Sequence, residues 1–195
     1  MQKINGKKMR KIILYLQLSL DGVVSDPDKW ATISDEIIAS SLEAYKSLDT
    51  ILVGSNGYAS LAEYWQQAEH TSESEIERRF AKEINNIKKY VISRSNVDLV
   101  WKNSEQLFIN DEASLVSEIN KLRQTEGKNI SVESGLKTWQ LFLKNDLFDE
   151  LALFFHPVIA GHGDKLFTDL NKTNLELINT KKHENGVISL HYKKA

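Results

Sequence analysis

Short apolar runs that alternate with longer amphipathic segments constrain the fold of this chain more than any other feature. The runs have the length and the β-branched content of buried strands. They cover residues 11–18, 50–53, 90–93, 98–101, 130–133 and 150–158. Because strands that alternate with helices need crossover connections, this order predicts a mostly parallel sheet that is buried on both faces.

Four helices are predicted from apolar residues that recur at spacings of three and four, the period of an amphipathic helix. Asn110-Asp111 precedes the third of them and has the chemistry of a helix cap. The apolar faces are formed by Ile38, Leu42 and Tyr45, by Ile76, Phe80, Ile84 and Ile87, by Leu115, Val116, Ile119 and Leu122, and in a short last helix by Trp139, Phe142 and Leu143.

The last third of the chain changes character. A Gly-rich turn at 161–163 follows the strand at 150–158, and apolar segments at 175–180 and 187–192 flank Asn185-Gly186. Asn-Gly is a strong hairpin signal because both residues tolerate a positive φ. The sequence therefore predicts a single α/β domain, with a mostly parallel central sheet, antiparallel C-terminal strands and helices on both faces.

The composition bounds the class of protein. The 195 residues suffice for one domain with a hydrophobic core, which we expect over 10–195 after a flexible N-terminal tail at 1–9. The net charge of −2 gives no sign of a nucleic-acid partner, and no apolar stretch approaches the ~20 residues of a membrane span. The absence of cysteine excludes disulfides, thiolate metal sites and cysteine nucleophiles, and it fits a reducing, cytoplasmic location.

Two further chemistries have no motif in this sequence. The five histidines lack the spacing of a metal site, so we expect no bound metal. His156, near a strand end, is interpreted as structural rather than catalytic. No Gly-x-Ser-x-Gly sequence occurs, which argues against a serine hydrolase.

Five short segments occur in an order that points to a known fold. They are Ser19-Leu20-Asp21-Gly22 after the first strand, the strand at 50–53 with Gly54, the strand at 89–94 that ends in Ser93-Arg94, the strand and turn at 130–135, and the segment 158–163 followed by Leu166-Phe167. With these segments the chain resembles the dihydrofolate reductase-like fold. The resemblance is closest to the reductase domain at the C-terminus of the bifunctional riboflavin-biosynthesis deaminase-reductase and to its stand-alone bacterial relatives.

The resemblance implies an NADPH-dependent reductase of a small pterin- or pyrimidine-like heterocycle, with the NADP(H) site at three strand ends. A helix start after Gly54 would offer N–H groups to phosphates. The Ser93 hydroxyl and the Arg94 guanidinium would hold the adenosine 2′-phosphate. The implied cofactor-binding residues are Gly54, Ser55, Ser93, Arg94, Glu133, Ser134, Gly135 and Leu136.

Two departures from the family pattern leave an alternative open. The family has Gly-Arg after the second strand and Gly-Gly after the strand at 130, where this chain has Gly54-Ser55 and Ser134-Gly135. A lost phosphate contact costs about 1.5–3 kcal/mol, and a Cβ at Ser134 would crowd the pyrophosphate. The alternative is a non-catalytic nucleotide- or flavin-binding protein on the same fold. Taken by itself, the turn at 133–135 also suits an ordinary helix start, with Ser134 as the cap.

The residues at the reacting end are also implied by the resemblance. Trp30 and Asp35 have a spacing similar to that of the Trp and the substrate-binding carboxylate of dihydrofolate reductases. Asp35 is therefore the first candidate for a catalytic carboxylate and Glu36 the second, whereas Asp21 and Trp30 are candidates for substrate contacts. Asp35 and Glu36 also suit an ordinary acidic helix start. Asp21, with the glycine after it, also suits an ordinary turn.

The resemblance carries two further expectations. It implies a homodimer, formed through the antiparallel end of the sheet. The deaminase half of the riboflavin enzyme needs a cysteine zinc site, and this chain has no cysteine. A general reductase of a small-molecule substrate is therefore favoured over a dedicated riboflavin role.

Overall fold

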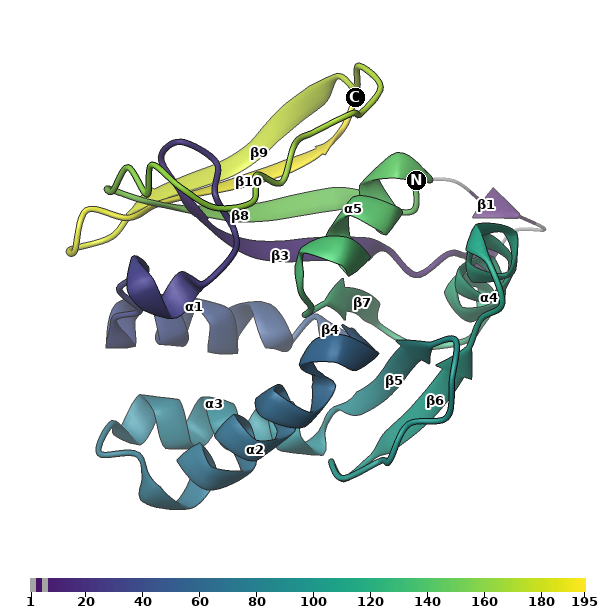
Figure 1. The fold of residues 1–195 in the computed structure, drawn as a ribbon, viewed down its shortest axis with the longest axis horizontal. Coiled ribbons are helices and arrows are strands. Elements are labelled where there is room, and N and C mark those ends of the chain that lie inside the picture. The colour runs from purple at the N-terminus through teal and green to yellow at the C-terminus, as the bar shows by residue number, and fades with distance from the viewer. Residues whose placement is uncertain (1–2, 5–6) are drawn as a thin grey trace.

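The fold is that of a computed structural model, which describes residues 3–4 and 7–195 and is built around one eight-stranded sheet (Figure 1). The strand order is β6-β5-β4-β7-β3-β8-β10-β9. Neighbours from β6 to β8 run parallel, and β10 pairs antiparallel with both β8 and β9. The strands are β3 (Ile12–Ser19), β4 (Leu48–Gly54), β5 (Lys88–Ser93), β6 (Ser104–Phe108), β7 (Asn129–Val132), β8 (Glu150–His156), β9 (Leu175–Lys182) and β10 (Ile188–Lys194). The mostly parallel sheet with antiparallel C-terminal strands is confirmed.

Helices cover both faces of the sheet, as expected. They are α1 (Asp35–Tyr45), α2 (Ser55–Thr71), α3 (Glu75–Asn86), α4 (Glu112–Gln124) and α5 (Leu136–Lys144), with a 3₁₀ turn η1 (Pro27–Lys29). The alternation along β3 separates the two faces, because Leu14 packs in a cluster with Leu115 of α4 and Phe142 of α5. Ile13 packs instead in the cluster that holds Ile38 of α1, together with residues of α2 and α3.

Two short strands precede this sheet. β1 (Lys3–Ile4) and β2 (Lys7–Lys8) pair antiparallel in a sheet of their own. The flexible tail expected at 1–9 falls partly on residues 1–2 and 5–6, which lie outside the described residues. That expectation therefore stays a prediction.

The strand predicted at 98–101 is wrong, because the structure places the edge strand β6 later, at Ser104–Phe108. The apolar run reads as a strand because of Trp101, which anchors a loop. The Trp101 ring is 2% exposed, its backbone N–H donates to Tyr58 Oη (2.8 Å) and its Nε1 donates to Asn85 Oδ1 (2.6 Å). β6 itself has polar residues, as an edge strand tolerates, so it lacks the apolar signature.

The carboxyl ends of neighbouring parallel strands meet at one edge of the sheet. Gly54 of β4 lies opposite Ile92 of β5, and Leu52 of β4 lies opposite Val132 of β7, which pairs in turn with β3. The turns that follow β5, β4, β7 and β3 therefore lie side by side. Ligands of open α/β sheets bind outside such an edge.

Candidate functional site

A cavity of about 520 Å³ opens beside this edge, between α1 and the helical hairpin formed by α2 and α3. Its walls are largely apolar and aromatic, with Leu61 and Trp65 from α2 and Phe80 from α3. The sheet contributes Gln17 of β3 and Glu133, the residue after β7. A cavity of this size and character suits a small, flat organic molecule.

Glu133 is a largely buried carboxyl group in this site. Its Oε1 accepts a hydrogen bond from Ser131 Oγ (2.7 Å), and its backbone N–H donates to Leu52 O (3.0 Å). Burial raises the pKa of Glu133 to about 7, against the opposing effects of the Ser131 and Tyr45 hydroxyls. Both protonation states are therefore accessible near neutral pH, which suits a general acid or base.

Gln17 is held in one orientation by a buried histidine. Thr32 N–H donates to His156 Nδ1 (3.2 Å), so the His156 proton lies on Nε2, which donates to Gln17 Oε1 (2.7 Å). Burial lowers the pKa of His156, which favours this neutral form. Since its oxygen is occupied, Gln17 presents its amide NH₂ as a hydrogen-bond donor in the cavity wall.

The implied cofactor residues come together in two adjoining turns. Gly54 N–H donates to Ser134 Oγ (2.8 Å), which joins the turn after β4 to the turn after β7. A Cβ at Gly54 would overlap Thr138 Oγ1 and lie 2.8 Å from Ser134 Oγ, so this close approach requires glycine. At Gly135 no atom lies within 4 Å of such a Cβ, so the second turn is open on that side.

The first turns of α2 and α5 differ from those of the other three α-helices. Ser34, Ser74 and Asp111 cap α1, α3 and α4 through their side chains. α2 begins after Gly54 and α5 after Gly135, and neither has a side-chain cap. The interpretation of this turn as an ordinary helix start with Ser134 as its cap is therefore wrong, because no side chain caps α5. The backbone N–H groups at Ser55 and Leu136 begin two bare helix N-termini, where an anion is favoured.

Ser93 is the last residue of β5 and Arg94 follows it, next to the turn after β4. Ser93 Oγ accepts a hydrogen bond from Ser95 N–H (3.1 Å) and donates to Ser95 O (2.7 Å). Arg94 is exposed and makes no ion pair within the described part of the chain. Its charge is felt at the start of α4, where it adds to the Ser114 hydrogen bonds that lower the pKa of Asp111.

Asp21 and Trp30 shape the loops at the end of β3. Asp21 accepts hydrogen bonds from Ser19 Oγ (2.7 Å), Ala160 N–H (2.9 Å) and Gly161 N–H (3.1 Å). These bonds, the one from Ser19 first, lower its pKa to about 2. Trp30 packs edge-on against His156 (5.6 Å between ring centres) and lies outside the lining of the cavity.

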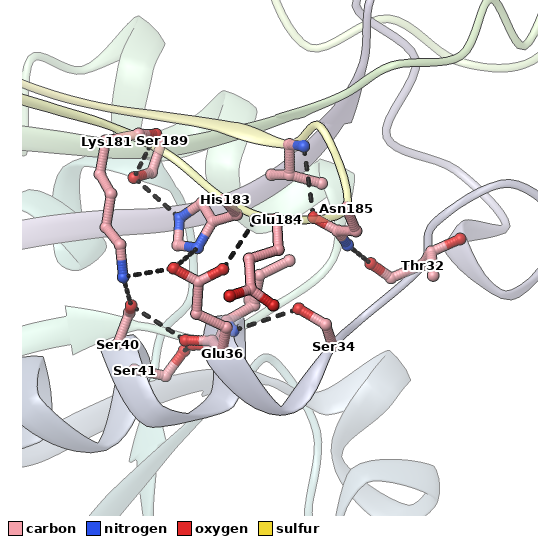
Figure 2. Close-up of polar contacts among 12 residues, drawn as sticks. Thr32, Ser34, Glu36, Ser40, Ser41, Lys181, His183, Glu184, Asn185 and Ser189 are labelled. Atoms are coloured by element: carbon pink, nitrogen blue, oxygen red, sulfur yellow. Dashed lines mark hydrogen bonds and ion pairs between the residues drawn. The ribbon is translucent and has the colours of Figure 1, made fainter.

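The two candidate carboxylates at the start of α1 separate in space. Asp35 lies at the exposed rim of the cavity and accepts a hydrogen bond from Ser74 Oγ (2.8 Å). Glu36 points to the β9–β10 hairpin, where it accepts hydrogen bonds from Lys181 Nζ (2.8 Å) and Glu184 N–H (2.8 Å) (Figure 2). Glu36 lines a second groove of about 590 Å³, between α1 and the antiparallel strands. The structure thus brings Asp35, but not Glu36, to the cavity that holds Glu133.

Sequence reasoning missed Gln17 and the proton-carrying role open to Glu133. A signal existed for Gln17, because it is a polar residue in an apolar strand and shares a face with Tyr15, opposite Leu14 and Leu16. No cluster of three or more metal-ligating side chains occurs among the described residues. Within the same ranges, no helix is both long and apolar enough to cross a bilayer.

Known proteins match this chain over nearly its whole length. YyaP, an uncharacterized protein of Bacillus subtilis (strain 168), is 30% identical over 192 residues, which are 96% of this chain and 97% of YyaP. The deaminase/5-amino-6-(5-phosphoribosylamino)uracil reductase of Thermotoga maritima has a TM-score of 0.66 at 18% identity, over 96% of this chain and 57% of that one. A pyrimidine reductase-like protein of Corynebacterium diphtheriae has a TM-score of 0.61 at 18% identity, over 95% of this chain and 92% of that one.

The two structural likenesses establish the fold alone. A match to a family carries more, and the RibD C-terminal domain family matches residues 10–189, from two residues before β3 into β10. The five segments of the resemblance lie within that range. This chain therefore belongs to the RibD C-terminal domain family.

Proposed function

We propose that this protein is an NADPH-dependent reductase that transfers a hydride to a small pterin- or pyrimidine-like heterocycle. The observation that carries the proposal is the placement of two uncapped helix N-termini, at Ser55 and Leu136, beside a cavity that contains a protonatable carboxyl group. Membership of the RibD C-terminal domain family supports the same reading. A cytoplasmic location is part of the proposal, and it fits a chain without cysteine.

The residues at the strand ends fit a dinucleotide. The first turns of α2 and α5 would receive the pyrophosphate, over the open side of Gly135. Arg94, with Ser93 beside it, would hold the 2′-phosphate through charge-assisted hydrogen bonds. When bound, the nicotinamide would supply the hydride.

The cavity residues would bind and protonate the substrate. The NH₂ group of Gln17 would donate a hydrogen bond to an acceptor on the substrate, held in place by His156. Glu133, which keeps its proton to about pH 7, would give that proton to the substrate atom next to the reduced carbon. Asp35 would act at the rim, and Glu36 would act only through its hold on the β9–β10 hairpin.

A specific observation favours a second function. Ser134 Oγ occupies the N–H of Gly54, and no arginine follows that glycine. This leaves fewer donors for a pyrophosphate than a bare Gly-Gly turn would. The alternative is a non-catalytic protein that binds another nucleotide or a flavin on the same fold.

Thermal unfolding with NADPH, NADH and FMN separates the two functions. A ligand at a hundred times its Kd stabilises the fold by about 2.7 kcal/mol, which raises Tm by several degrees. We expect NADPH to raise Tm and Arg94→Ala to abolish most of that rise, whereas Arg79→Ala, an exposed arginine on α3, serves as the matched control. A rise with FMN alone would favour the binding protein.

We further propose a homodimer formed through β9. This strand ends the sheet and is exposed along its whole length, with Leu175, Leu177 and Ile178 between 37% and 47% exposed. An apolar edge strand that is left uncovered invites pairing with another chain. A second copy of this chain would cover it.

A further inference from the structure

The cavity beside Glu133 extends well beyond its polar end. The α2–α3 hairpin supplies a wall of Leu61, Trp65, Phe80 and Ile84. Trp65 is fixed between two other rings, with its centre 4.8 Å from that of Tyr64 and 5.1 Å from that of Phe80, both edge-on. This part of the site offers a ligand a largely apolar and aromatic surface.

The charges around the cavity have one sign. Four carboxyl groups line it, those of Asp28, Asp35, Glu77 and Glu133, and no lysine, arginine or histidine belongs to its lining in the described part of the chain. Arg78, which follows Glu77, is turned away, since its Nη1 donates to Ser72 O (2.5 Å). A phosphate group placed here would lose its water and find no cation, which is unfavourable.

We propose that the substrate of this cavity is an unphosphorylated molecule with a largely apolar body, neutral or cationic overall, that carries a hydrogen-bond acceptor for the NH₂ group of Gln17. The inference rests on the proposed function only in calling the ligand a substrate. It separates this site from that of the Thermotoga maritima protein, which is named for a phosphorylated pyrimidine.

The geometry of Gln17 makes the acceptor specific. His156 Nε2–H donates to the amide oxygen (2.7 Å), so turning the amide over would set its NH₂ group against that N–H. A carbonyl oxygen or an unprotonated ring nitrogen satisfies the NH₂ group, whereas an N–H at the same place leaves both donors unpaired. The apolar wall then receives the remainder of the ring system.

Three probes with one bicyclic frame test the proposal. They are quinoxalin-6-ylmethanol, which is neutral, the corresponding 6-methylamine, which is cationic, and the phosphate monoester of the alcohol. Titration calorimetry would measure the Kd of each for the full chain, with and without saturating NADPH. We expect the alcohol and the amine to bind, and the phosphate ester to bind at least tenfold more weakly than the alcohol.

A charge variant supplies the control. The double variant Asp28→Asn/Glu77→Gln should strengthen binding of the phosphate ester at least threefold and leave binding of the alcohol unchanged, because the carboxylates repel the anionic ester and the alcohol has no charge. The matched double variant Glu63→Gln/Glu83→Gln removes exposed carboxylates from α2 and α3 outside the cavity and should change neither. Gln17→Leu should weaken binding of the alcohol, because the variant loses the hydrogen-bond donor to the ring nitrogen of this probe.

The outcomes distinguish this inference from the proposed function. If NADPH binds and the phosphate ester binds as tightly as the alcohol, the inference is overturned while the reductase proposal stands. If the alcohol and the amine bind but NADPH does not, the inference stands and the reductase proposal fails. Binding of none of the three probes would overturn the inference outright.

Discussion

Glu133 carries a proton at a pH where a carboxyl group in water has lost it. Its pKa is raised from 4.5 to about 7 by burial, so ionisation opposes folding in that interval. The contribution to stability is complete below pH 4.5 and is lost as the pH rises through 7. The substitution Glu133→Gln removes this dependence on pH. The change that it causes in the free energy of unfolding should therefore be more favourable at pH 8 than at pH 4.5, by about 1–3 kcal/mol.

Urea unfolding at the two pH values measures this difference. Glu83→Gln, at an exposed position on α3, is the control and should show the same small effect at both. An equal effect of Glu133→Gln at pH 4.5 and pH 8 would mean that the carboxyl group is not buried in the folded protein.

His183 gives stability the opposite dependence on pH. It is 1% exposed in the β9–β10 hairpin and packs on Phe154, and burial lowers its pKa although Glu36 acts to raise it (Figure 2). The unfolded chain therefore binds the proton more readily, and this residue's contribution is present above its ordinary pKa of about 6.5 and lost as the pH falls below it. The difference in free energy of unfolding between the wild type and His183→Asn should therefore become smaller as the pH falls from 7.5 to 5. A constant difference would show that His183 is protonated alike in both states.

The sequence predicted the strand-end residues but not the contacts that orient them. Ser93, Gly54 and Ser134 were found because each belongs to a short local pattern at the end of an apolar run. The hydrogen bond from His156 to Gln17 joins β8 to β3, and no local pattern encodes a pairing between side chains so distant in sequence. The raised pKa of Glu133 was missed for the same reason, since it depends on what the fold buries around it.

At the scale of elements, the turn between β4 and α2 is tied to the turn between β7 and α5. Gly54→Ala would push a Cβ against Thr138 Oγ1 and Ser134 Oγ, so we expect a loss of about 1–3 kcal/mol in the free energy of unfolding. At the NADPH site proposed above, the same change should weaken binding of the cofactor, because it separates the two helix N-termini. Gly57→Ala, three residues on within α2, meets no atom within 4 Å and should stabilise the fold by roughly 0.5–1 kcal/mol.

Opposite signs for these two glycine variants in urea unfolding would support the close approach of the turns. A stabilising effect of Gly54→Ala would contradict it. The comparison is sharp because both variants add one methyl group to the same helix start.

The elements themselves were predictable to different degrees. Buried strands and the helices α1, α3, α4 and α5 follow from apolar periodicity, and the cap at Asp111 marks the start of α4. The same periodicity did not predict α2. β6 was not predicted, because an edge strand needs no apolar pattern. The loop around Trp101 was wrongly predicted as a strand, because this buried residue completes an apolar run. Apolar periodicity indicates which residues are buried. It therefore fails to predict a strand that pairs without being buried, and it predicts a strand where a buried residue lies in a loop.

At the scale of the whole molecule, the two ends of the sheet differ. β6 is a short edge strand with polar residues and one exposed ring, Phe108, whereas the longer β9 exposes Leu175, Leu177 and Ile178. β9 is attached to the rest of the sheet only through β10, among the strands described. The antiparallel end therefore carries apolar surface that one copy of the chain does not bury.

A homodimer through β9 is the corresponding prediction. A stable interface buries more than about 1,000 Å² in total, so a charge at its centre should break it. We expect light scattering after size exclusion to give a dimer for the wild type and a monomer for Leu177→Lys, with the fold intact by circular dichroism. Leu99→Lys changes a leucine that is 40% exposed in the loop before β6 and should leave the dimer unchanged. A monomeric wild type would contradict the prediction, and so would dissociation by Leu99→Lys alone, because either result would place the apolar contact elsewhere than β9.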